Sequence, residues 1–135
     1  MPINWNPNLM KIGIATIDSQ HQELFDALNK FYDAFMQHRD NDEIIAIIDF
    51  LGDYIIAHFD HETSLMRESG YPDLEKHIFQ HESFINTYQN FEERFETEGP
   101  TKKLMLTIYN SVYKWLVEHI SASDKEYGNF LSKNK

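Results

Sequence analysis

The chain of 135 residues contains no cysteine. That absence excludes disulfide bonds, thiolate metal sites and thiol catalysis, so any bound metal ion must be held by nitrogen and oxygen atoms. Glycine and proline are also scarce, at five and four residues, while 41% of the residues are hydrophobic and 14% are aromatic. This composition indicates an ordinary globular domain rather than a disordered chain.

Long hydrophobic runs and an excess of basic charge are missing as well. No segment approaches the roughly 20 apolar residues that span a bilayer, and the first residues do not join a basic stretch to an apolar one. The formal charge is −10, from 22 acidic and 12 basic side chains, which disfavours binding to nucleic acids and anionic membranes. We expect a cytoplasmic protein and, given the acidic surface, a monomer.

Apolar residues recur at helical intervals in four segments, separated by short polar corners. The pattern predicts an all-α fold in a single domain over residues 1–135, with an up-down-up-down antiparallel four-helix bundle. A non-helical arm over residues 1–18 precedes the bundle, and we expect apolar anchors such as Trp5 and Leu9 to pack it against the helices. The expected helices cover residues 19–38, 42–69, 73–97 and 101–131.

Five of the seven histidines fall on the inward sides of these helices; they are His21, His58, His77, His81 and His119. Residues four apart on a helix lie about 40° apart around its axis, so His58 with Glu62, and His77 with His81, can each reach one centre. A bundle core is where facing helices build metal sites. Together with Asp124, these residues predict a two-metal ligand set.

The pair His119 and Asp124 breaks the regular spacing. Residues five apart lie about 140° apart around an ideal helix, so one straight helix would aim the two side chains away from each other. We therefore predict that residues 120–123 depart from α-helical geometry through a π-type bulge or a break.

Other interpretations of these residues fit the sequence less well than a metal-ligand set does. A buried polar network without metal would leave several charges unpaired among apolar side chains, at a cost of several kcal/mol for each one. His38 and His61 are expected to be solvated surface residues. A zinc-protease helix is excluded because Leu65 and Ile85 stand where its second histidine is needed. The ferritin-like di-iron pattern also fails, because no candidate histidine follows a glutamate by three residues.

The chain resembles the bacterial hemerythrins over essentially its whole length, and all seven candidate ligands have a match in that family. The matching stretches are Ile17-Asp-Ser-Gln-His-Gln22, His58-Phe-x-x-Glu62, Tyr71-Pro72 ahead of His77-x-x-x-His81, and Trp115-Leu-x-x-His-Ile-x-x-x-Asp-x-x-Tyr127.

The resemblance implies a non-haem centre of two iron ions per chain with an oxo or hydroxo bridge, and dioxygen as its ligand. One iron would be held by His77, His81 and His119, and the other by His21 and His58. The carboxylates of Glu62 and Asp124 would bridge the two ions. Imidazole and carboxylate ligands alone are compatible with iron but do not exclude zinc or manganese.

The same family assigns four residues to the pocket around bound dioxygen, although plain core packing explains them equally well: Phe59, Trp115, Leu116 and Ile120. Tyr127 is a further pocket candidate behind the ligands, and core packing explains it as well. A dry apolar pocket favours reversible binding, because it excludes water and protons. We therefore expect an oxygen carrier or store rather than an enzyme. Two alternatives stay open: an oxygen or redox sensor that acts through a separate partner, and a protein that handles peroxide or nitric oxide or stores iron.

Overall fold

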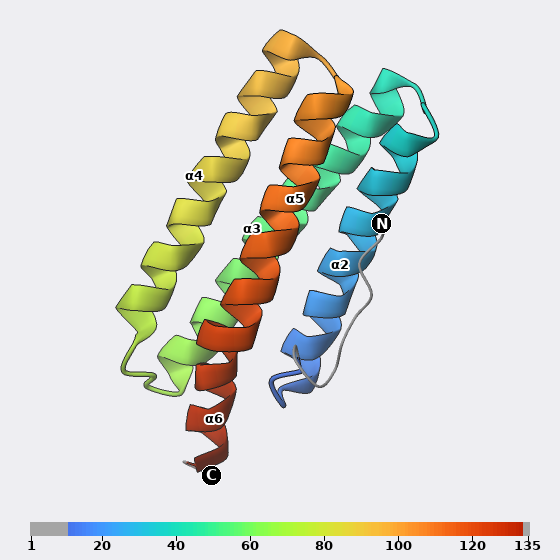
Figure 1. Cartoon of the computed structure of the whole chain (residues 1–135). Helices are drawn as coiled ribbons and strands as arrows, with labels where there is room; N and C mark the ends of the chain where they lie inside the picture. Colours follow the sequence, from blue (N-terminus) through green and yellow to red (C-terminus); the bar gives the residue numbers. More distant parts are fainter. Residues whose placement is uncertain (1–10, 134–135) are drawn as a thin grey trace.

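The computed structural model describes residues 11–133, and all regular secondary structure within that range is helical (Figure 1). The elements are α2 (Ala15–Met36), α3 (Asn41–Glu68), α4 (Leu74–Glu98), α5 (Lys102–His119), the π-helix η1 (Ile120–Asp124) and α6 (Lys125–Lys133).

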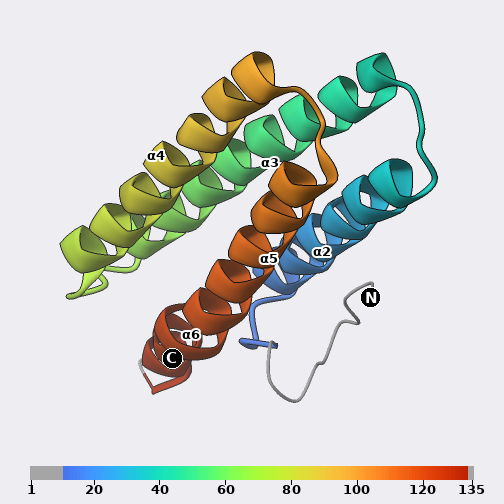
Figure 2. The same ribbon diagram turned by 45° about the horizontal axis from the view of Figure 1, so that its top comes forward.

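The four long helices run alternately up and down the molecule, so that consecutive helices are antiparallel (Figures 1 and 2). Helix α2 packs against α3 and α5, and α4 packs against the same two helices, which closes the ring. Helix α6 continues the line of α5 beyond the π-helix (Figure 1). The predicted all-α, up-down-up-down bundle is therefore confirmed.

Local signals explain where the helices begin and end. The side chain of Asp40 accepts a hydrogen bond from the Glu43 backbone N–H at 2.9 Å, and Thr101 accepts one from Leu104 at 3.2 Å, so α3 and α5 start with capped N-termini. Helix α4 ends at Glu98 and is followed by Gly99, whose φ of 76° lies in the left-handed region. Glycine adopts that conformation without the steric cost that a side chain would add.

The first helix begins earlier than the sequence pattern predicts. Helix α2 starts at Ala15, so the described part of the arm ends at Ile14 rather than at residue 18. The carboxylate of Asp18 accepts hydrogen bonds from the backbone N–H groups of Ile12 at 2.8 Å and Gly13 at 3.1 Å, which fixes the chain immediately before the helix. The expected contacts of Trp5 and Leu9 lie outside the described residues.

The far end of α2 also differs slightly from the expected boundary. The helix stops at Met36, because His38 has a φ of 55° and cannot continue it. Across the described residues, none of the helices combines the length and the apolar composition that crossing a membrane requires.

The predicted ligand residues come from the same end of the bundle. His21 lies in the first turns of α2, His58 and Glu62 lie toward the end of α3, and His77 and His81 lie at the start of α4. Because the helices alternate in direction, the start of α2, the end of α3, the start of α4 and the end of α5 lie at the same end of the bundle (Figure 1).

Candidate metal centre

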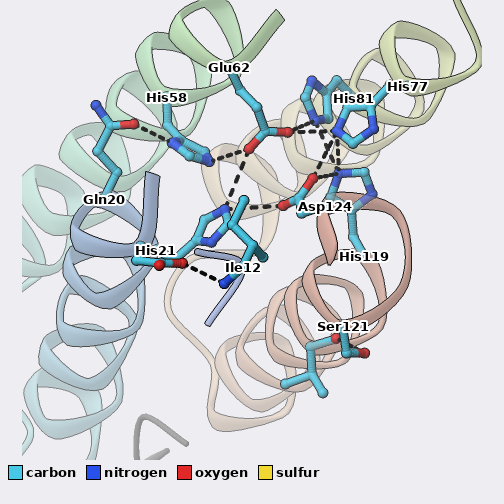
Figure 3. A network of polar contacts seen from close by, with 12 residues as sticks. Ile12, Gln20, His21, His58, Glu62, His77, His81, His119, Ser121 and Asp124 are labelled. Atoms are coloured by element: carbon cyan, nitrogen blue, oxygen red, sulfur yellow. Dashed lines mark hydrogen bonds and ion pairs between the residues drawn. The ribbon is translucent and has the colours of Figure 1, made fainter. Parts of the chain in front are cut away.

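The structure brings all seven predicted ligand side chains into one buried cluster, drawn in Figure 3. None of them is more than 7% exposed. Their side chains converge from α2, α3, α4, α5 and the π-helix, and they are His21, His58, Glu62, His77, His81, His119 and Asp124. Within the cluster, two overlapping groups have ligand atoms that all lie within 4.8 Å of one another.

The larger group contains three histidines and the two carboxylates. His77 Nε2 lies 2.6 Å from Glu62 Oε1 and 2.8 Å from Asp124 Oδ1. His119 Nε2 lies 3.0 Å from Asp124 Oδ1 and 3.1 Å from the Nε2 atoms of both His77 and His81. Three imidazoles that present the same nitrogen to one another indicate a common centre between them.

The smaller group contains His21, His58 and Glu62. His58 Nε2 lies 3.2 Å from Glu62 Oε2, and His21 Nε2 lies 3.5 Å from the same oxygen and 3.1 Å from Asp124 Oδ2. The rings of the two histidines meet edge to face, with centroids 4.7 Å apart.

Each carboxylate divides its two oxygens between the groups. Glu62 directs Oε1 toward His77 and Oε2 toward His58, and Asp124 directs Oδ1 toward His119 and Oδ2 toward His21. Two ions in the two groups would therefore share both carboxylates, one oxygen for each ion.

The π-helix explains how His119 and Asp124 reach the same group. The five residues Ile120–Asp124 adopt π geometry, with one more residue in the turn than an α-helix has. The wider turn rotates Asp124 back toward the side on which His119 lies. This is the departure from α geometry that their five-residue spacing requires.

The distances and unpaired atoms in the cluster fit bound metal ions. Adjacent ligands around a six-coordinate ion with bonds of about 2.1 Å are separated by about 3 Å, which is close to the separations found here. Three of the inward-facing atoms are buried and, despite these close approaches, form no hydrogen bond of acceptable geometry: His21 Nε2, Glu62 Oε2 and Asp124 Oδ1. Buried polar atoms rarely lack partners unless an ion or water supplies one.

In the metal-free chain the cluster behaves as a network of opposite charges. Burial disfavours the charged forms of His21 and His77, but contacts with Asp124 and Glu62 outweigh it and raise each pKa to about 9. Burial likewise opposes ionisation of Glu62 and Asp124, yet the surrounding imidazoles hold both pKa values well below their usual range. Burial dominates at His81, whose pKa falls to about 4.

Two of the predicted pocket residues cover the cluster with aromatic rings. Phe59 stacks on His81 with centroids 3.8 Å apart and an interplanar angle of 5°, and Trp115 stacks on His119 at 4.3 Å and 14°. Phe59 also lies 5.9 Å from the ring of His58, so it contacts both groups of ligands.

The remaining pocket residues lie in different surroundings. Leu116 and Ile120 are each 1% exposed in the core. Tyr127 is also buried, but its hydroxyl lies 3.0 Å from Ser69 Oγ and its ring packs edge to face on Tyr71. This position places Tyr127 in an aromatic cluster beside the predicted ligands.

The two remaining histidines lie outside both groups of ligands. His38 is exposed, as predicted. His61 is only partly exposed, and its Nε2 atom is buried without a hydrogen-bond partner, so the prediction of a fully solvated side chain is wrong for that nitrogen.

Two supporting residues were not identified from the sequence. The carbonyl oxygen of Gln20 lies 2.8 Å from His58 Nδ1, and Gly128 lies so close to the Ile12 carbonyl that an added Cβ would sit 2.1 Å from its oxygen. An isolated glycine inside a helical pattern costs about 1 kcal/mol relative to alanine, so its presence indicates a packing reason, and this was the available signal for Gly128. Gln20 lies in the stretch Ile17-Asp-Ser-Gln-His-Gln22 that carries the family resemblance, but no feature of the sequence indicated its contact with His58.

Comparisons with known proteins point to one family. Residues 12–131 match the family model described as the hemerythrin HHE cation binding domain. The chain is 29% identical to the bacteriohemerythrin of Methylococcus capsulatus, over 96% of this chain and 97% of that protein. It is 32% identical to the bacteriohemerythrin of Clostridium acetobutylicum, over 87% of this chain and 92% of that protein. A crystal structure of wild-type hemerythrin superposes with a TM-score of 0.85 at 28% identity, covering 94% of this chain and 95% of that one.

Proposed function

The chain belongs to the hemerythrin family, and on that premise we propose that it is an oxygen carrier or store that binds dioxygen reversibly at a di-iron centre. One observation carries the proposal. The two carboxylates, Glu62 and Asp124, each present one oxygen to the three-histidine group and the other oxygen to the two-histidine group. That division is the arrangement that a pair of ions needs in order to share both carboxylates.

We assign one iron to His77, His81 and His119 and the other to His21 and His58, with Glu62 and Asp124 as bridges and an oxo or hydroxo group between the ions. When bound, the iron pair supplies the electrons for reversible binding of dioxygen. His21 and His58 would offer one nitrogen fewer to the second ion than His77, His81 and His119 would offer to the first, which would leave the second ion an open position for a ligand. An open position distinguishes a reactive metal site from a closed structural one.

The residues around the ligands support carriage rather than oxygenation. Phe59 and Trp115 lie on the imidazoles of His81 and His119, and apolar neighbours of this kind keep water away from a metal site. Neither group of ligands contains a carboxylate other than Glu62 and Asp124, so a dedicated proton donor is missing from both groups. We propose that the apolar pocket consists of Phe59, Trp115, Leu116, Ile120 and, farther from the centre, Tyr127.

Repeated exposure of the iron-loaded chain to dioxygen and vacuum, followed by visible spectroscopy, tests the proposal. A carrier or store gains and loses the absorption of the oxygenated state over many cycles with little decay. A sensor autoxidises within a few cycles and changes its contacts with a partner. An enzyme for peroxide or nitric oxide consumes its substrate continuously. Either of the last two outcomes would contradict the carrier assignment.

The proposal also includes a monomeric protein located in the cytoplasm. The formal charge of −10 supports the monomer, because like charge opposes association of identical chains. Light scattering of the iron-loaded chain at several concentrations tests the oligomeric state, and cell fractionation tests the location.

A further inference from the structure

The ligand histidine His58 is contacted at both of its ring nitrogens. Its Nε2 atom faces Glu62 Oε2 at 3.2 Å, inside the cluster, and its Nδ1 atom lies 2.8 Å from the side-chain oxygen of Gln20 (Figure 3). Gln20 is partly buried on α2 and directly precedes His21. The same turn of α2 therefore contributes one ligand and contacts a second ligand on α3.

Two other histidines of the cluster differ in this respect. The Nδ1 atoms of His21 and His81 are buried without a hydrogen-bond partner among the described residues. In the two-histidine group, His58 is thus the ring whose outer nitrogen meets a side-chain acceptor, whereas the outer nitrogen of His21 meets none.

A hydrogen bond at Nδ1 has two physical consequences for an imidazole that binds metal through Nε2. It holds the proton on Nδ1 and fixes the orientation of the ring, and it raises the electron donation from the ring to the metal. The second effect depends on the acceptor, because a carboxylate forms a stronger, charge-assisted bond than a neutral amide does. Gln20 therefore orients His58 without adding a third negative charge to a site that already holds Glu62 and Asp124.

We propose that Gln20 is a positioning residue for His58: its oxygen accepts a hydrogen bond from Nδ1–H, which aims Nε2 at the metal, and, because the amide is neutral, keeps the iron at His58 easy to reduce. This inference rests on the proposed di-iron function. If the inference holds, the uncharged side chain of Gln20 shifts the equilibrium of the centre toward the reduced, oxygen-binding state and away from the oxidised, inactive state.

Two substitutions at residue 20 separate orientation from charge. Gln20→Leu removes the acceptor, and Gln20→Glu keeps an acceptor of almost the same shape while adding a negative charge. Gln22→Glu is the matched control, because Gln22 is exposed on the same helix two residues away and the charge change is identical.

The first measurement uses zinc in place of iron, so that the ring proton of His58 is visible by NMR. We expect slow exchange of the Nδ1 proton with water in the unchanged chain and in Gln20→Glu, and fast exchange in Gln20→Leu. Zinc affinity should fall by about 10- to 100-fold in Gln20→Leu, the usual range for the loss of an outer hydrogen bond to a ligand. Unchanged exchange and affinity in Gln20→Leu would overturn the positioning role.

The second measurement is the reduction potential of the iron-loaded chains. Gln20→Glu should have a lower potential and a faster autoxidation than Gln22→Glu. Equal potentials in these two variants would overturn the role of the neutral amide. A failure of the unchanged chain to cycle with dioxygen would instead contradict the proposed function, so the two failures are distinguishable.

Discussion

His119 Nε2 and Asp124 Oδ1 lie 3.0 Å apart although the two residues are separated by five positions in the sequence. The π-helix Ile120–Asp124 makes this contact possible, since a regular α-helix would direct the two side chains about 140° apart. The π-helix, a conformation that is rare in proteins, thus lies where it brings the Asp124 carboxylate into the cluster of predicted ligands.

Removal of either shared carboxylate is expected to disrupt both halves of the centre. Glu62→Ala or Asp124→Ala deletes one oxygen from each group of ligands, so the iron content after purification should fall well below that of the unchanged chain. Elemental analysis per chain measures this directly. The control is His61→Ala, which should leave the iron content unaltered because His61 belongs to neither group. Full iron content in Glu62→Ala would count against the bridging assignment.

Loss of the indole at residue 115 is expected to admit water to the centre. Trp115 stacks on His119 at 4.3 Å and on Phe84 at 4.2 Å, so Trp115→Ala should increase the rate of autoxidation several-fold. Decay of the oxygenated spectrum at fixed pH gives the rate. Tyr113→Ala serves as the control, because Tyr113 lies on the same helix and is 40% exposed. Equal decay rates in the two variants would refute the shielding role of Trp115.

Gly128 allows the segment before α2 to lie against α6. A Cβ at residue 128 would sit 2.1 Å from the Ile12 carbonyl oxygen, and backbone atoms cannot yield as a flexible side chain does. Gly128→Ala should therefore lower the free energy of unfolding by about 1–3 kcal/mol, the usual cost of overpacking. Chemical denaturation measures the change, with the exposed neighbour Asn129→Ala as control. If Gly128→Ala lowers the free energy of unfolding no more than Asn129→Ala does, the close approach of Gly128 to the Ile12 carbonyl does not limit the size of residue 128.

The metal-free chain is expected to lose stability on the alkaline side of neutrality. The pKa values of His21 and His77 are raised from 6.5 to about 9 in the fold, mainly by Asp124 and Glu62 against the opposing effect of burial. Their contribution is fully present below pH 6.5 and is lost as the pH rises through 9, because the folded chain then releases the protons that it binds more tightly than the unfolded chain does. Denaturation at a series of pH values should show this decline, and His21→Gln should make it smaller. A stability that rises over this range would contradict the charge network.

Much of the fold could be predicted from the sequence, because apolar residues at helical intervals define which side of each helix is buried. The spacing of His58 with Glu62 and of His77 with His81 likewise indicates that the two side chains of each pair lie together. The unusual spacing of His119 and Asp124 was informative for the same reason, since α geometry could not unite them.

Other features depend on contacts between distant segments and could not be predicted. The helix boundary at Ala15 depends on the hydrogen bonds from Ile12 and Gly13 to Asp18, which form only when the arm folds back. The contact of Gln20 with His58 joins residues 38 positions apart. Which aromatic ring covers which imidazole depends on the relative rotation of neighbouring helices, and periodicity alone does not define that rotation.

The most direct test of the central claim is a crystal structure of the iron-loaded chain with diffraction recorded at the iron absorption edge. We predict two anomalous peaks in the bundle, one among the Nε2 atoms of His77, His81 and His119 and the other beside those of His21 and His58, with Glu62 and Asp124 spanning both. A single peak, or peaks away from these side chains, would contradict the account.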